Sequence, residues 1–120
     1  DAAAILAESK TLLAQGRYVR NLRKLVAAVA ADPKNRELRK GLLEGAILTK
    51  DWKTAVAQIE PLRPFRDGEE PWMFYGAIAL YETGALREAR ELTDRARPRL
   101  SRSPFVDYYI RKIQGSAPPG

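Results

Sequence analysis

Carboxylates are the main candidates for proton-transfer chemistry in this sequence, because it contains no histidine and no cysteine. A pair of carboxylic side chains can act as acid and base, as in glycoside hydrolysis. Most of the acidic residues, however, lie beside lysine or arginine, as Glu91 and Arg95 do at a helical i,i+4 spacing. Surface ion pairing accounts for this arrangement, so we predict that the protein is not an enzyme.

Other reaction chemistries lack their characteristic residues. The sequence has no GxSxG nucleophile motif and no glycine-rich phosphate-binding loop. Without cysteine and histidine, a thiolate nucleophile, a disulfide framework and an ordinary zinc site are also excluded. We therefore expect no catalytic residues, no metal and no cofactor.

The charge balance is basic, with 21 lysines and arginines against 15 acidic residues and a formal net charge of +6. Such a balance favours nucleic acid, acidic lipid or an acidic protein as partner, or it is simply an arginine-rich surface. One basic cluster begins at Arg17 and another surrounds Pro98. Single-strand binders interleave basic and aromatic side chains, whereas here they fall mainly on different predicted helices. Nucleic acid is therefore the weaker alternative.

Three short segments mark the ends of the helices that would position these residues. Gly16-Arg17-Tyr18, Lys50-Asp51-Trp52 and Gly84-Ala85-Leu86 follow one another at intervals of 34 residues. Apolar side chains around them recur every three or four positions, which is typical of helices with one buried face. The pattern predicts helices over residues 2–15, 18–31, 37–49, 52–60, 71–83, 86–96 and 104–113, and no strands.

This period and these residues resemble the tetratricopeptide repeat over residues 2–103. The motif positions are Gly16, Tyr18, Trp52, Ala55, Gly84, Leu86 and Ala89, while Lys50 replaces a glycine and Asn21 replaces a small residue. The resemblance implies an all-α fold, a right-handed superhelical array of antiparallel helix hairpins. It gives repeats over about 2–35, 36–69 and 70–103, a cap helix over about 104–113, one domain over 1–114 and a disordered tail over 115–120.

The resemblance also implies a binding face, because the first helix of each hairpin lines the concave side of such an array. The positions expected there are Leu6, Lys10, Leu13, Lys40, Glu44, Ile47, Phe74, Ile78, Tyr81 and Tyr108. We therefore predict a non-catalytic scaffold that binds a peptide or helix of a partner protein. The alternatives are a basic helical-repeat protein that binds nucleic acid and a regulatory part of a larger enzyme.

The sequence says less about the source and the compartment of the protein. The longest apolar run, residues 25–31, is far shorter than the roughly 20 residues that span a bilayer. The first residue is Asp1, which suggests an excised or processed chain. Alanine and arginine usage resembles that of a GC-rich bacterium, so we expect a protein of the bacterial cytoplasm or periplasm. By analogy with bacterial proteins that contain such repeats, we expect a role in secretion, pilus or envelope assembly. The oligomeric state stays open.

Overall fold

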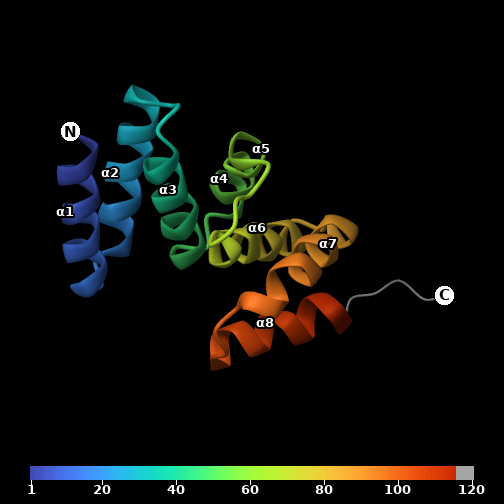
Figure 1. Ribbon diagram of the computed structural model, residues 1–120. Coiled ribbons are helices and arrows are strands. Elements are labelled where there is room, and N and C mark those ends of the chain that lie inside the picture. Colours follow the sequence, from blue (N-terminus) through green and yellow to red (C-terminus); the bar gives the residue numbers. More distant parts are fainter. Residues whose placement is uncertain (116–120) are drawn as a thin grey trace. The chain divides into compact units, whose positions relative to one another are not determined.

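The computed structural model describes residues 1–115, and every regular element in that part of the chain is helical (Figure 1). The elements are α1 (Ala2–Ala14), α2 (Tyr18–Ala31), α3 (Arg36–Leu48), α4 (Trp52–Ala57), α5 (Ile59–Leu62), α6 (Glu70–Glu82), α7 (Leu86–Ala96), a short 3-10 turn (Arg97–Arg99) and α8 (Pro104–Gly115). The predicted all-α class is thereby confirmed. Of the predicted disordered tail 115–120, Gly115 belongs to α8 and the remainder lies outside the described residues.

One predicted helix is wrong in detail. The segment 52–60 is not a single helix, since α4 ends before Gln58 and α5 then continues through Pro61 to Leu62. The amide of Gln58 donates to the carbonyl of Ala55 at 3.1 Å, which is a tighter turn than the α-helix makes. Proline has no N–H to donate to the carbonyl four residues earlier, so a continuous α-helix would lack one bond at Pro61.

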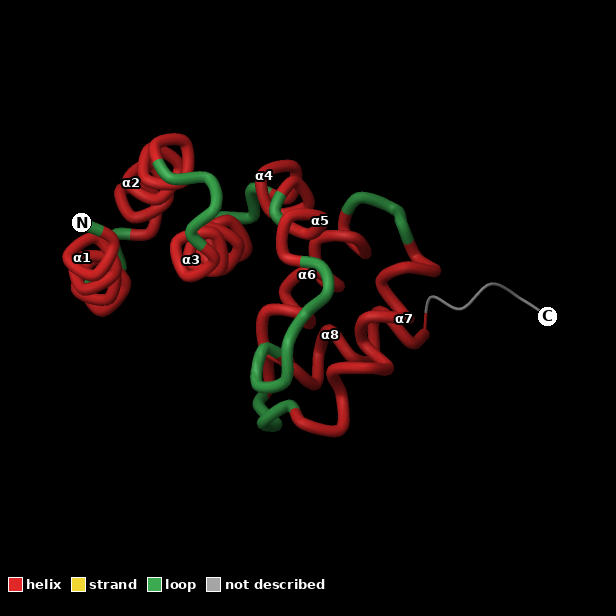
Figure 2. The backbone as a smooth tube through the Cα atoms, turned by 45° about the horizontal axis from the view of Figure 1, so that its top comes forward, coloured by secondary structure: helices red, strands yellow, loops and turns green. Residues whose placement is uncertain are grey.

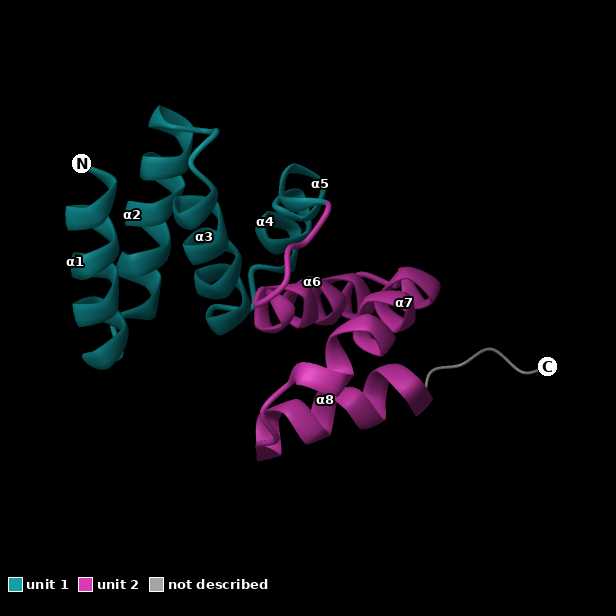
Figure 3. Cartoon of the chain, viewed as in Figure 1, with its two compact units in different colours: residues 1–63 teal, residues 64–120 magenta. Residues whose placement is uncertain are grey.

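The chain divides into two compact units, residues 1–63 and the part from residue 64 onward (Figure 3). Unit 1 contains α1–α5, and unit 2 contains α6–α8. The boundary falls within the predicted repeat 36–69, after the second helix hairpin. The assignment of the three repeats and of one domain over 1–114 stays a prediction.

In unit 1, each helix packs against the next one along the chain. α1 contacts α2, α2 contacts α3, α3 contacts α4, and α1 also contacts α3. Figure 2 shows α1, α2 and α3 side by side, viewed close to their axes. The core between them is apolar, with Leu25, Leu38 and Leu43 almost entirely buried. Burial of such side chains stabilises each helix by roughly 1.5–3 kcal/mol per residue relative to exposure.

In unit 2, α6 packs along α7, and α8 contacts both of them. α6 is apolar around most of its circumference, and its Phe74, Ala77 and Ile78 are buried. Leu92 of α7 and Ile113 of α8 are buried as well. This arrangement leaves the N-terminal half of α8 near the surface, with Phe105 and Tyr108 exposed.

The three segments at which the predicted helices end share one backbone geometry. Gly16, Lys50 and Gly84 have φ of 72°, 59° and 91°, in the left-handed region that glycine adopts most readily. In each case the following amide closes the helix by donating to a carbonyl five residues earlier, as in a Schellman cap. The pairs are Arg17 to Leu12, Asp51 to Ala46 and Ala85 to Leu80, at 2.9, 2.8 and 2.8 Å.

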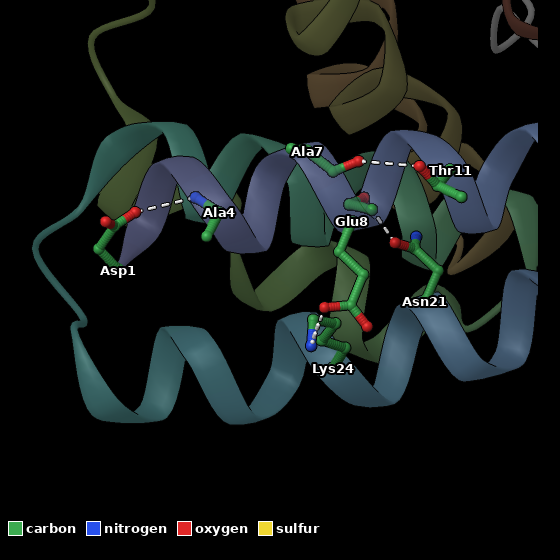
Figure 4. A network of polar contacts seen from close by, with 8 residues as sticks. Asp1, Ala4, Ala7, Glu8, Thr11, Asn21 and Lys24 are labelled. Atoms are coloured by element: carbon green, nitrogen blue, oxygen red, sulfur yellow. Dashed lines mark hydrogen bonds and ion pairs between the residues drawn. The ribbon is translucent and has the colours of Figure 1, made fainter.

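Asn21 lies fully buried between helices, at a position where the tetratricopeptide resemblance implies a small residue. The Ser9 hydroxyl donates to its Oδ1 at 2.5 Å and so joins α1 to α2. Figure 4 shows Asn21 beside α1, near the exposed ion pair between Lys24 Nζ and Glu8 Oε2 at 2.7 Å. A Cβ at Gly45 of α3 would lie 3.1 Å from Asn21 Nδ2, so the absent side chain makes room for the larger amide.

Candidate protein-binding site

Four aromatic side chains of unit 2 gather at the end of α6 and along α8, and we call them the aromatic cluster. They are Tyr81, Phe105, Tyr108 and Tyr109. The Tyr109 ring is at the centre, with its centroid 6.4 Å from Tyr81, 5.4 Å from Phe105 and 5.1 Å from Tyr108. All three contacts are edge-to-face, the arrangement that the aromatic quadrupole favours.

The outer members of the aromatic cluster remain accessible. Phe105 is 45% exposed and Tyr108 is 47% exposed, whereas Tyr109 is partly covered. Lys112 Nζ lies 5.7 Å from the centroid of the Tyr108 ring, within reach of a cation–π interaction. Large aromatic side chains that combine exposure with a fixed geometry are typical anchors of protein interfaces.

A hydrogen bond between helices holds the central ring. The Tyr109 hydroxyl donates to Glu82 Oε2 at 3.1 Å, which ties α8 to the last residue of α6. Burial, followed by the negative charge of Glu82 and the hydrogen bond to it, raises the pKa of Tyr109 to about 12. The hydroxyl therefore stays protonated near neutral pH and continues to act as a donor.

A pocket of about 270 Å³ lies beside the aromatic cluster in unit 2. Its walls come from the first two turns of α6, the first turn of α8, the last residue of the 3-10 turn and the loop that follows it. The lining residues are Pro71, Phe74, Tyr75, Arg99, Leu100, Ser101, Ser103, Phe105 and Val106. The pocket, which we call the α6–α8 pocket, is thus mainly apolar and aromatic, with one arginine and two serines.

The loop that forms one wall of the α6–α8 pocket is fixed by two local contacts. The Ser103 hydroxyl accepts a hydrogen bond from the Val106 amide at 3.1 Å, which caps the beginning of α8. Arg102 forms an ion pair with Asp107 of the first turn of α8. Because both contacts bind the loop to α8, the pocket wall is defined before any partner arrives.

The predicted partner-binding residues have unequal accessibility. Lys10 and Tyr108 are exposed, and Leu6, Leu13, Lys40, Glu44 and Tyr81 are half-buried. Ile47, Phe74 and Ile78 are buried, at 5%, 1% and 0% exposure. A buried side chain cannot form the surface of an open groove, so Ile47 and Ile78 are not accessible to a partner, and Phe74 is reached only through the α6–α8 pocket that it lines.

The structure brings together only part of the predicted face. Tyr81 and Tyr108 are linked through Tyr109 in unit 2. In unit 1, Leu6 packs against the core and Lys40 Nζ pairs with Glu37 Oε2 at 2.7 Å. Their role toward a partner stays a prediction.

The predicted motif residues also differ in burial. Gly16 and Gly84 have the expected positive φ, and Ala55 and Ala89 are fully buried. Trp52 and Leu86 are half-buried. Tyr18 is 40% exposed, and the fully buried side chains of α2 are Asn21 and Leu25.

Several site residues were missed from the sequence. Phe105 and Tyr109 stand at i and i+4, with Tyr108 between them, on the helix predicted as a cap, a spacing that could have indicated one aromatic face. Arg99 and Ser103 lie in a proline-interrupted segment with no periodicity, so no sequence signal placed them beside Phe74.

Neither a metal centre nor a membrane span emerges from residues 1–115. No three acidic side chains in that range are close enough together to hold a metal ion. None of the helices described there is both long and apolar enough to cross a bilayer.

Comparison with known proteins returns no relatives: no protein-family model matches the chain, and neither the curated proteins nor the solved structures show significant similarity to it. The resemblance to the tetratricopeptide repeat therefore depends on the residues and the geometry of this chain alone.

Proposed function

We propose that this protein is a non-catalytic scaffold that holds a peptide or a helix of another protein against the α6–α8 face of unit 2. The observation that carries the proposal is the pair of exposed rings, Phe105 and Tyr108, next to the α6–α8 pocket. Exposed aromatic side chains beside a cavity supply the large contact area from which most interface energy comes.

The frame around these rings favours binding because little of it needs to be ordered by a partner. Tyr109 is held by Glu82 and by three edge-to-face contacts. The pocket loop is held by the Ser103 cap and by the pair of Arg102 with Asp107. A preorganised site avoids the free-energy cost of immobilising each side chain, roughly 0.5–1.5 kcal/mol.

We infer further that the helix hairpins belong to a tetratricopeptide-like array with a concave binding face. The three left-handed turns at 34-residue intervals support this inference. So does the packing order in unit 1, where α1 contacts both its hairpin partner α2 and the next first helix, α3. On this proposal, the accessible first-helix positions Leu6, Lys10, Leu13, Lys40 and Glu44 are candidate contacts within unit 1.

Nucleic-acid binding is the second candidate, and one observation favours it. Arg111 and Lys112 lie on α8 together with the exposed Phe105 and Tyr108, so basic and aromatic side chains share one helix. Bases could stack on such rings while phosphates contact the cations. This mode would weaken steeply with added salt, because counterion release drives it.

Selection from a random peptide library displayed on phage tests the proposed function. We expect the chain to enrich peptides whose binding is lost in Tyr108→Ala, a variant of a half-exposed side chain that should change stability little. Tyr18→Ala is the matched control, since it removes another exposed tyrosine from unit 1. Failure to enrich any peptide, or equal loss of binding in both variants, would contradict the proposal.

A further inference from the structure

We propose that the α6–α8 pocket accepts one aromatic or large aliphatic side chain from an acidic segment of a partner protein, and that Arg99 binds a carboxylate of that segment. This inference depends on the proposed function and names the chemistry of the partner. It combines the size of the pocket, its lining and the charges around it.

The size of the pocket suits a single side chain. A cavity of about 150 Å³ can bind benzene, so the α6–α8 pocket, at about 270 Å³, has room for an aromatic ring or a branched aliphatic side chain. Pockets for drug-sized molecules begin at roughly 300 Å³ and bury most of the ligand. The volume therefore accommodates one anchor side chain of a partner protein.

The lining of the pocket contains several apolar side chains and one cation. Phe74 is almost completely buried, and Leu100, Phe105 and Val106 complete the apolar contact surface. Burying an apolar side chain there would remove its surface from water at roughly 25 cal/mol per Å². Arg99 is exposed and supplies the cation of the lining.

The segment that supplies most of the pocket lining is basic, whereas Glu69 and Glu70 precede the lining residue Pro71. Residues 95–112 contain six basic side chains and one acidic side chain, Asp107. Two of the six already have a polar partner, because Arg102 pairs with Asp107 and Arg97 donates to Gln114 Oε1 at 2.8 Å. Lys112 lies over the Tyr108 ring.

The remaining three basic side chains, Arg95, Arg99 and Arg111, are exposed and have no polar partner within residues 1–115. Unpaired guanidinium groups favour an acidic partner by charge complementarity, and a planar guanidinium can bind a carboxylate through two parallel hydrogen bonds.

A protein segment fits these features better than single-stranded RNA does. Phe74 is buried and offers no open ring face for base stacking, which leaves Phe105 as the one exposed phenylalanine of the lining. Arg99 and Phe105 instead line one pocket, a combination that matches an apolar side chain with a neighbouring carboxylate. RNA binding is accordingly one outcome of the test.

The probe is a short synthetic peptide with a central tryptophan and glutamates on both sides, and binding to the full chain is followed by fluorescence anisotropy. We expect replacement of its tryptophan by alanine, or of its glutamates by glutamine, to weaken binding at least about tenfold, as the loss of one buried anchor or charged contact would. Arg99→Glu should cause a similar loss. Arg95→Glu is the matched control, because it reverses the charge of an exposed arginine that does not line the pocket. This variant should weaken binding by only about twofold, through long-range electrostatic interaction with the acidic peptide.

A second variant tests the pocket without touching charge. Ser101→Trp, at an exposed loop position of the lining, should block entry of the anchor and weaken binding at least about tenfold while the melting temperature stays unchanged. Equal effects of Arg99→Glu and Arg95→Glu, or binding unchanged in Ser101→Trp, would overturn the inference.

The phage selection separates the two proposals. Enriched peptides that are neither acidic nor aromatic would refute the partner chemistry but leave the scaffold function standing. No enriched peptide would refute the function itself. Salt-sensitive binding of an oligouridylate that competes with the peptide and is lost in Arg99→Glu would overturn both in favour of RNA.

Discussion

Lys50 has the same left-handed backbone conformation as Gly84, which follows it by 34 residues. Lys50 follows the end of α3, and Gly84 follows the end of α6. The amide after each residue donates to a carbonyl five residues earlier, at 2.8 Å in both cases. A side chain in this conformation crowds the following carbonyl, which costs roughly 1–2 kcal/mol. At Lys50 the cap of the next helix offsets part of this cost, because Asp51 accepts hydrogen bonds from the amide and the hydroxyl of Thr54.

The first prediction concerns this strained lysine. Lys50→Gly should raise the free energy of unfolding by about 0.5–1 kcal/mol, since relief of the Cβ crowding exceeds the added entropy of the unfolded glycine. Denaturant titration should show a higher midpoint with an unchanged slope. Gly84→Ala is the matched reverse change and should lower stability by about 1 kcal/mol, because its φ of 91° strains any side chain. A lower midpoint for Lys50→Gly would contradict the shared turn geometry.

The second prediction concerns the contact between Asn21 and Gly45. Gly45→Ala adds a methyl group 3.1 Å from Asn21 Nδ2 in a buried site and should lower stability by about 1 kcal/mol, despite the better helix propensity of alanine. In an Asn21→Ala background the same change should raise stability by up to about 1 kcal/mol, because the amide no longer opposes it.

A double-mutant cycle measures this change of sign. We expect a coupling free energy of about 1–2 kcal/mol between the two sites. Gly41→Ala provides the control, since a Cβ there meets only leucine methyl groups at 3.5 Å or beyond. Additive effects of Asn21→Ala and Gly45→Ala would show that the two helices do not meet at these residues.

The sequence predicted the helices well because their signals are local. Apolar periodicity and the residues at Gly16, Lys50 and Gly84 act within a few positions along the chain, and these residues all end helices as expected. The break at Gln58 was missed, because the predicted helix 52–60 had no signal for an interruption three residues before Pro61.

The site was harder to predict than the helices because it depends on contacts between segments far apart in the sequence. Phe74 and Arg99 line the same pocket although 25 residues separate them. Whether an aromatic residue such as Phe74 is buried or exposed also depends on which helices cover it, and helix periodicity does not encode that. Tyr108, which was expected on the binding face, is 47% exposed, and its role toward a partner stays a prediction.

The third prediction concerns the buried bond between Ser9 and Asn21. Ser9→Ala should lower the free energy of unfolding by about 1–3 kcal/mol, because it leaves the Asn21 Oδ1 buried without its donor. Thr11→Ala, two positions further along α1, removes an exposed hydroxyl and should change stability by less than about 0.5 kcal/mol. Equal melting temperatures for both variants would mean that the Ser9 bond contributes nothing.

The fourth prediction concerns the pH dependence of the Tyr109 contact. Because the pKa of Tyr109 is raised to about 12 in the folded chain, against 10.0 for an ordinary tyrosine, the folded state binds the hydroxyl proton more tightly than the unfolded state does. The stability that this contributes is complete below about pH 10 and is lost as the pH rises toward about 12. Tyr109→Phe, which cannot titrate, should lose less stability over this range than the unmodified protein does.

Glu82→Gln tests the cause of the raised pKa. It keeps a hydrogen-bond acceptor near the Tyr109 hydroxyl but removes the negative charge, so the pKa of Tyr109 should fall, while burial, the largest cause, keeps it above 10.0. Titration of the tyrosinate absorbance measures this directly, with Tyr109→Phe identifying the transition that belongs to Tyr109. Glu88→Gln is the control, because it removes an exposed carboxylate from α7 that is not among the causes of the shift. A Tyr109 transition that moves equally in Glu82→Gln and Glu88→Gln would mean that overall charge sets the pKa and that α8 is not tied to the end of α6 through this hydrogen bond.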